Sequence, residues 1–208
     1  MELNYLKMDS DTFNSEEDSY GEETESKTIK EEQEMKINPN LHLIDSISKA
    51  LILILEENQK LKNYKDILQK QNKMIFSARY IPDISIIDYL NRIQIYSNLE
   101  KSTLIISLIY IDRFCELSKT ILTYYNIHRI LFASILIAIK YNEDNFYDNN
   151  FYSEIAGIKL EELNMIEKKF ISMCNFQFFI SVDIFENYKR YLISFDNLDN
   201  NRKTNLLN

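Results

Sequence analysis

Glycine and proline are nearly absent from this 208-residue chain, which contains only two of each. Globular proteins normally contain about 7% glycine and about 5% proline, so the chain has few residues that favour turns. This scarcity predicts a mostly helical protein. Loops that cradle a phosphate need glycine for close approach of the backbone, and Gly21 and Gly157 lie far apart. A nucleotide-binding enzyme is therefore disfavoured.

Cysteine and histidine are equally scarce, with two residues of each. Cys115, Cys174, His42 and His128 form no C-x-x-C pair and no ligand cluster, so neither a metal site nor a cofactor is expected. Lone thiols in apolar helices are typical of a reducing compartment, which indicates a cytoplasmic or nuclear protein. The sequence has no signal-peptide pattern and no apolar run of the about 20 residues that a membrane span needs, so no membrane association is expected.

The net charge of −8 belongs to the N-terminal segment, because residues 1–36 contain 12 acidic and 4 basic residues and leave 20 of each for the rest. Residues 1–38 have few apolar side chains and cannot bury enough surface to offset their ordering entropy. They are predicted to be an acidic disordered tail. The neutral remainder has no basic stripe, so nucleic acid is not an expected partner.

Apolar residues recur at helical spacing in several segments after Pro39. The first helix is expected from Leu41 to about Asn58, with Asn40 as a possible cap. The polar stretch that completes residues 39–74 is a linker or a weakly helical extension. Later helices are predicted over residues 86–97, 100–117, 160–174 and 182–195. Residues 197–208 form a polar C-terminal tail.

Two local signals mark helix ends. Ser85 followed by Asp88 resembles a capping box at the start of a helix. Gly157 ends a short turn of helix, where its missing Cβ suits a left-handed C-cap. Residues 141–152, rich in Asn, Asp and aromatic residues, are expected to form a packed loop.

Residues 126–144, NIHRILFASILIAIKYNED, are predicted to be the central helix of the fold. Every residue from Ile130 to Ile139 is apolar except Ser134, and a helix with no polar face is either buried or spans a membrane. This run is too short to span, so burial is expected. Lys140 follows immediately, and an ammonium at the end of an apolar helix needs a carboxylate, carbonyl groups or a partner protein.

Glu167 is the second charge in an apolar setting, with Leu163 four residues before it and Phe170 and Ile171 shortly after it. Burial again demands a partner for this carboxylate. Two interpretations remain open. Lys140 and Glu167 form an internal salt bridge, or both face the backbone of another protein.

Five helices around an all-apolar third one resemble the cyclin box, and the match becomes specific over residues 82–192. The runs DYLNRI, LIYIDRF, NIHRIL and ELNMIE are similar to the P-type cyclins, the fungal phosphate-pathway and plant U-type group. The resemblance implies an all-α fold: a single five-helix cyclin box over residues 75–196, with an additional N-terminal helix before it. Only 12 residues follow Asp196, too few for a second repeat.

The resemblance also implies roles for individual residues. Lys140 and Glu167 correspond to the pair that hydrogen-bonds the backbone just before the αC helix of a cyclin-dependent kinase. Arg92 and Asp112 correspond to a structural ion pair between the first two helices of the box. Four further residues correspond to positions that offer apolar surface to the kinase: Ile137, Tyr141, Ile171 and Phe176.

The implied function is that of a regulatory subunit, without catalytic residues of its own, that binds and activates a cyclin-dependent kinase catalytic subunit as a heterodimer. The alternative is a cyclin-fold scaffold that binds proteins without activating a kinase. A nucleic-acid-binding cyclin fold is disfavoured because the chain has neither a basic face nor a second repeat. Residues 91–95, NRIQI, lack the hydrophobic substrate-docking sequence of S-phase and mitotic cyclins. No arginine precedes Arg79, which excludes an arginine-based destruction box in the tail.

Overall fold

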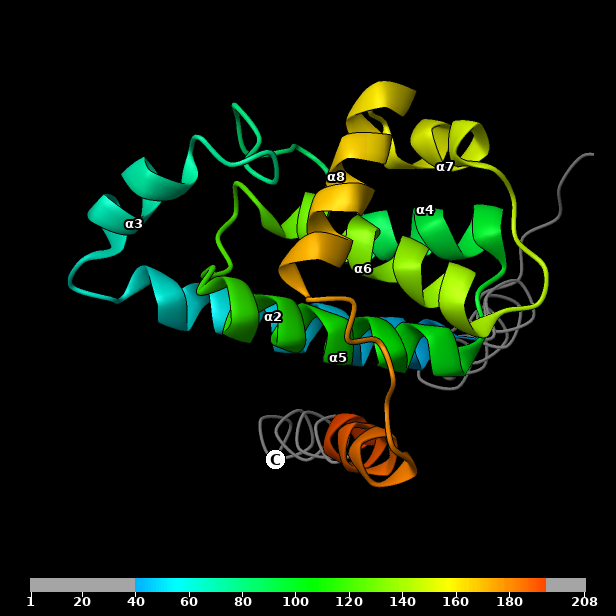
Figure 1. Ribbon diagram of the computed structural model, residues 1–208. Coiled ribbons are helices and arrows are strands. Elements are labelled where there is room, and N and C mark those ends of the chain that lie inside the picture. The colour runs from blue at the N-terminus through cyan, green and yellow to red at the C-terminus, as the bar shows by residue number, and fades with distance from the viewer. Residues whose placement is uncertain (1–39, 194–208) are drawn as a thin grey trace, which may run out of the picture. The chain divides into compact units, whose positions relative to one another are not determined.

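The computed structural model describes residues 40–193, and all regular secondary structure in this range is helical (Figure 1). The predicted tails, residues 1–38 and 197–208, lie outside the described residues. The helices are α2 (Leu41–Gln59), α3 (Tyr64–Gln71), α4 (Ile86–Ser97), α5 (Lys101–Ser118), α6 (Ile127–Asn142), α7 (Asn149–Ala156) and α8 (Leu160–Met173). Residues 182–193 are also helical. The all-α prediction is confirmed. None of these described helices is long and apolar enough to cross a membrane.

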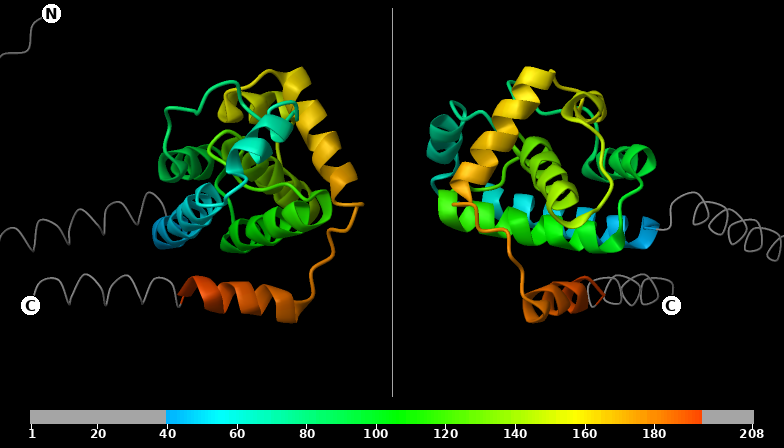
Figure 2. Two further views of the ribbon diagram at one scale, coloured as in Figure 1. Left: turned by 90° about the vertical axis from the view of Figure 1, so that its left-hand side faces the viewer. Right: turned by 45° about the vertical axis from the view of Figure 1, so that its right-hand side comes forward.

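Helix α6 lies at the centre of the fold, as its sequence predicted. The right-hand view of Figure 2 shows α6 in the middle, with α5 beneath it and α4 and α8 on either side. Every residue from Ile130 to Ile139 is buried. The one polar residue of this run, Ser134, donates a hydrogen bond from Oγ to the Leu131 carbonyl oxygen at 2.7 Å, so its burial leaves no donor unpaired.

Three buried aromatic rings join the segment before α4 to α5 and α8. The Phe114 ring lies 4.9 Å from that of Phe76 in an edge-to-face arrangement and 4.6 Å from that of Phe170 in a stacked one. All three side chains are almost completely buried. Such aromatic pairs are stabilised beyond their area burial by about 0.5–1.5 kcal/mol each.

Both cysteines are free thiols, with Cys174 buried and Cys115 half-buried. Burial raises the pKa of each thiol to about 12. Protonated thiols behave as small apolar side chains, so both act as the core residues that the sequence predicted.

Ser85 caps α4 as predicted, because its Oγ accepts a hydrogen bond from the Asp88 amide at 3.1 Å. The Asp88 carboxylate accepts from the Ser85 hydroxyl, so the pair forms the cap without the reciprocal bond to the Ser85 backbone that defines a capping box. Gly157 ends α7 in the left-handed conformation, at φ 70°, as predicted. Asn40 precedes α2 but does not cap it. Its side-chain amide instead donates to Gln94 Oε1 at 3.0 Å and to the Leu99 carbonyl oxygen at 2.7 Å, which fixes the start of α2 against the α4–α5 turn.

Two segments are more helical than the sequence indicated. The polar stretch before residue 74 was expected to be a linker or a weakly helical extension of the first helix. It contains the separate helix α3. Residues 149–156, expected as a loop and a short turn, form the full helix α7, capped by Asp148 Oδ1 accepting from the Phe151 amide at 3.0 Å. By sequence, the helix expected at residues 182–195 is the fifth of the box. Because α7 is a full helix, α4 to α8 already number five, and the helix at residues 182–193 follows them.

Candidate functional site

An ion pair joins the end of α6 to the middle of α8. Lys140 Nζ lies 2.6 Å from Glu167 Oε1, and the two side chains are 28% and 14% exposed. The Asn149 side-chain amide donates to Glu167 Oε2 at 2.7 Å and to Asn164 Oδ1 at 2.7 Å. Lys140 occupies the last turn of α6, where a cation is stabilised by the helix dipole.

This geometry combines elements of both interpretations left open by the sequence. Lys140 and Glu167 satisfy each other, as an internal salt bridge requires. Both nevertheless reach the surface, so the main chain of another protein could approach them. Asn149 Oδ1 is buried and has no hydrogen-bond partner among residues 40–193, which leaves an acceptor beside the pair. Sequence reasoning missed Asn149, because nothing in the run of Asn and Asp residues distinguished it from its neighbours.

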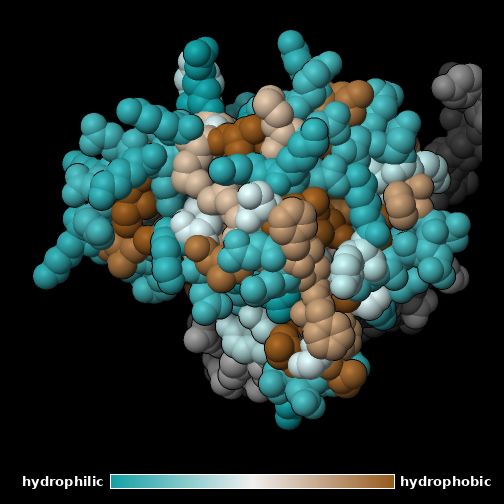
Figure 3. All heavy atoms as spheres, in the orientation of Figure 1, coloured by the Kyte–Doolittle hydropathy of each residue, from teal (hydrophilic) through white to brown (hydrophobic). Residues whose placement is uncertain are grey.

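Exposed aromatic side chains lie on the elements that carry the pair. Tyr141, directly after Lys140, is 58% exposed, and Phe176, just beyond α8, is 75% exposed. Ile171, on α8, is half-buried and packs against the core. Figure 3 shows apolar residues gathered on the face that holds α8 and the segment after it. The charged pair therefore belongs to a surface with several apolar side chains.

Ile137 does not belong to this surface. Its side chain is only 4% exposed, so the prediction that it offers apolar surface to a partner is wrong. The physical reason is that other helices enclose α6 from Ile130 to Ile139. Beyond this run, Lys140 and Tyr141 are the next side chains of α6 to emerge from the core.

Phe176 is held in a strained backbone conformation. Asn175 and Phe176 have φ of 50° and 57°, in the left-handed region that costs a residue with a Cβ about 1–2 kcal/mol. The Phe176 amide donates to the Ile171 carbonyl oxygen at 3.2 Å, so the turn is tied to the end of α8. Strain of this kind concentrates at binding sites, and here it holds an aromatic ring in solvent.

The predicted ion pair between Arg92 and Asp112 is absent among the described residues, and that prediction is wrong. Arg92 Nη2 donates to the Glu154 carbonyl oxygen at 2.9 Å, which joins α4 to α7. Asp112 accepts a hydrogen bond from the Tyr188 hydroxyl, which joins α5 to the helix at residues 182–193. Each side chain faces a different neighbour, and burial raises the pKa of the Asp112 carboxyl.

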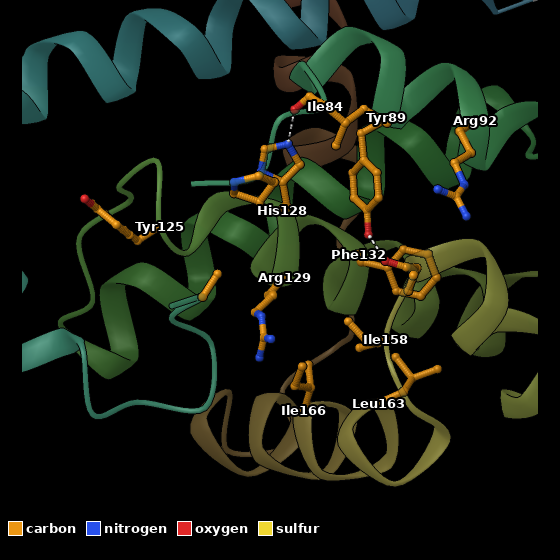
Figure 4. A pocket seen from close by; sticks show the side chains of 14 residues that line it. Ile84, Tyr89, Arg92, Tyr125, His128, Arg129, Phe132, Ile158, Leu163 and Ile166 are labelled. Atoms are coloured by element: carbon orange, nitrogen blue, oxygen red, sulfur yellow. Dashed lines mark hydrogen bonds between the residues drawn. The ribbon is translucent and has the colours of Figure 1, made fainter. Parts of the chain in front are cut away.

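A separate cavity of about 320 Å³ lies between α4, α6 and α8. Figure 4 shows apolar side chains that line it: Phe132, Ile158, Leu163 and Ile166. The polar groups beside them serve the chain's own structure. Arg129 pairs with Glu162 at 2.6 Å, and His128 Nε2 donates to the Ile84 carbonyl oxygen at 2.9 Å. Within residues 40–193, no cluster of three His, Cys, Asp or Glu side chains is placed to hold a metal ion.

His128 makes the stability of the fold sensitive to acid. Burial lowers the pKa of His128 in the folded protein below the ordinary value of 6.5, which applies to the unfolded chain. At a pH between the folded and the unfolded pKa, the unfolded chain therefore binds more protons than the folded one. Stability then falls as the pH decreases through 6.5 and below. We expect urea denaturation at pH 7, 6 and 5 to show this loss, and His128→Gln to lose less stability over the same range. His42→Gln, at an exposed position, is the control, and equal pH slopes for all three proteins would contradict the expectation.

The architecture, five helices of which the buried apolar α6 is the central one and carries a partly exposed lysine in its last turn, is that of a cyclin box. A family model described as Cyclin matches residues 7–178. The chain belongs to the cyclin family.

Similar proteins place the chain within that family. It is 36% identical to Cyclin-U2-1 of Arabidopsis thaliana over 115 residues, which are 55% of this chain and 52% of that protein. It is 32% identical to Cyclin-U4-3 of the same plant over 155 residues, 74% of this chain and 70% of the relative. It is 28% identical to PHO85 cyclin-7 of Saccharomyces cerevisiae over 198 residues, 86% of this chain and 70% of the relative. The chain spans about half the length of the first of these relatives. It is a cyclin of the P and U type, with one cyclin box in the part of the chain that the structure describes.

Proposed function

We propose that this protein is the regulatory subunit of a cyclin-dependent protein kinase, and that it binds the catalytic subunit as a heterodimer through the face around Lys140 and Glu167. The observation that carries the proposal is a partly exposed ion pair beside exposed aromatic residues. The name of the relative PHO85 cyclin-7 supports a role of this class. Lys140, Glu167, Tyr141, Ile171 and Phe176 are its proposed contact residues.

The proposed mechanism is activation by a shift between two kinase conformations. An inactive kinase of this class holds the glutamate of its αC helix away from the lysine that binds ATP, so the catalytic ion pair is broken. Apolar side chains packed against αC stabilise the inward position of that helix, and the population moves to the active state. Lys140 and Glu167 fix the register through charge-assisted hydrogen bonds, worth about 1.5–3 kcal/mol each.

Phe176 provides a test in which binding and stability change in opposite directions. Phe176→Gly removes an exposed ring and relieves the left-handed strain, so we expect the free energy of unfolding to rise by about 1 kcal/mol. Loss of an aromatic contact typical of binding hot spots should weaken kinase binding by about 2 kcal/mol, roughly thirtyfold. Asn175→Gly, at the neighbouring left-handed position, is the matched control and should keep full kinase binding.

The measurement uses the tagged full-length protein, purified from its native cells with the proteins bound to it. Recovery of a kinase that phosphorylates a generic substrate supports the proposal, provided that Phe176→Gly lowers the recovery. A bound kinase with only background activity would instead indicate a non-activating scaffold. Equal recovery by both variants and the wild type would show that this face does not bind the kinase.

A further inference from the structure

A second groove lies along α8, between this helix and residues 73–76, with a volume of about 680 Å³. Helix α8 contributes Met165, Lys168, Lys169, Ser172 and Met173. These residues follow the i, i+3, i+4, i+7, i+8 spacing of a single helical face.

This face of α8 is distinct from the one that carries the ion pair. At 3.6 residues per turn, the centre of the groove face lies roughly 150° around the helix axis from Glu167 and Ile171. The core residues of α8 occupy the arc on the remaining side. A partner in the groove and a partner on the Lys140–Glu167 face would thus contact opposite sides of one helix. The two partners would use different residues of α8, so each could bind without the other.

The groove combines an apolar floor with positively charged edges. Methionines line it from both sides: Met74, Met165 and Met173. Methionine is flexible and polarizable, and it is common on surfaces that accept varied peptide side chains. Met165 is 53% exposed, so this floor is open to solvent.

Three lysines stand at the groove, and all are exposed: Lys73, Lys168 and Lys169. None of them pairs with a carboxylate of residues 40–193, and no acidic residue of this range lines the groove. Residues 37–208 are neutral as a whole, so the positive charge is a local feature.

We propose that this groove binds an acidic segment of a partner protein that carries large apolar side chains. Carboxylates on the segment would complement the three lysines, and its apolar side chains would pack on the methionines. Complementary charge favours such an encounter and its register. The proposal does not depend on kinase binding, because the groove lies on another side of α8.

The direct test measures the fluorescence anisotropy of a labelled peptide, three repeats of Asp-Asp-Phe-Leu, titrated with the full-length protein. We expect saturable binding that weakens as the salt concentration rises, because surface charge is screened. Three repeats of Asp-Asp-Ala-Ala and of Lys-Lys-Phe-Leu should each bind at least tenfold more weakly, since one lacks the apolar side chains and the other has the wrong charge.

Variants locate the binding on the protein. Lys73→Glu with Lys168→Glu and Lys169→Glu should weaken binding of the acidic peptide at least tenfold. The matched control reverses three exposed lysines outside the groove and changes the net charge equally: Lys62→Glu, Lys65→Glu and Lys101→Glu. Met165→Ser, which changes no charge, should also weaken binding. Unchanged thermal unfolding confirms that each variant is folded.

Three outcomes would overturn the proposal. Equal loss in the groove variant and the control would indicate non-specific attraction. Carbodiimide cross-links from the groove lysines to acidic residues of the same chain would assign the groove to the protein's own N-terminal segment. Cross-links between two copies would assign it to self-association.

Discussion

Replacing Phe114 with alanine is expected to lower the free energy of unfolding by about 3–5 kcal/mol, the range for a large aromatic residue removed from a core. The Phe114 ring is completely buried and contacts Phe76 and Phe170 at centroid distances of 4.9 and 4.6 Å. These partners belong to separate segments of the chain, so filling the cavity would require α5, α8 and residue 76 to move together. Urea denaturation measures the change.

The matched control for this prediction is Leu117→Ala. Leu117 lies three residues later on α5, but its side chain is 38% exposed, so its loss should cost less than about 1 kcal/mol. A native domain is stable by only about 5–15 kcal/mol, and Phe114→Ala should therefore also lower the yield of folded protein. Similar losses for the two variants would show that the aromatic cluster does not hold the helices together.

The fold could be predicted because its strongest signal is local. The apolar run from Ile130 to Ile139 has no polar face, so it had to be buried, and the one-sided helices had to pack around it. Helix α7 escaped prediction for the opposite reason. Its residues, NNFYSEIA, have weak helix propensity, and the helix depends on its Asp148 cap and on packing against α4 and α8.

The side-chain partners could not be predicted from sequence. Arg92 and Asp112 were paired by resemblance, but each is satisfied by a neighbour more than 60 positions away along the chain, at Glu154 and Tyr188. Ile137 was placed at the surface by resemblance as well, but its side chain is only 4% exposed, because other helices enclose α6 at this position. The spacing of apolar residues defines which face of a helix is buried, and it does not identify which polar group a side chain meets.

An exchange of the two charges tests whether the Lys140–Glu167 pair only stabilises the fold or also binds the kinase. Exchanging the charges, with Lys140→Glu and Glu167→Lys, keeps attraction between the two positions. The Asn149 amide can turn so that its oxygen faces the new ammonium. A carboxylate in the last turn of α6 is disfavoured by the helix dipole, so the exchanged protein should be about 1 kcal/mol less stable than the wild type. It should be more stable than Lys140→Ala or Glu167→Ala, each of which leaves one charge unpaired.

The exchange should preserve most of the stability, but it should not preserve kinase binding. A kinase backbone presents its N–H and C=O groups in fixed positions. After the exchange, position 140 carries an acceptor where the kinase offers a C=O group, and position 167 carries a donor where the kinase offers an N–H group. Loss of two charge-assisted hydrogen bonds corresponds to about 3 kcal/mol or more, at least a hundredfold weaker binding in a titration with the purified kinase.

A second ion pair between the same two helices controls for general damage to the α6–α8 contact. Arg129 and Glu162 lie 2.6 Å apart, and their side chains are 21% and 32% exposed, close to the exposure of the Lys140–Glu167 pair. Arg129→Ala with Glu162→Ala should lower stability and leave kinase affinity within about twofold of the wild type, because neither residue belongs to the proposed contact face. If the Lys140–Glu167 exchange restored kinase binding along with stability, the pair would act only within the chain, and the kinase would have to recognise the apolar surface alone.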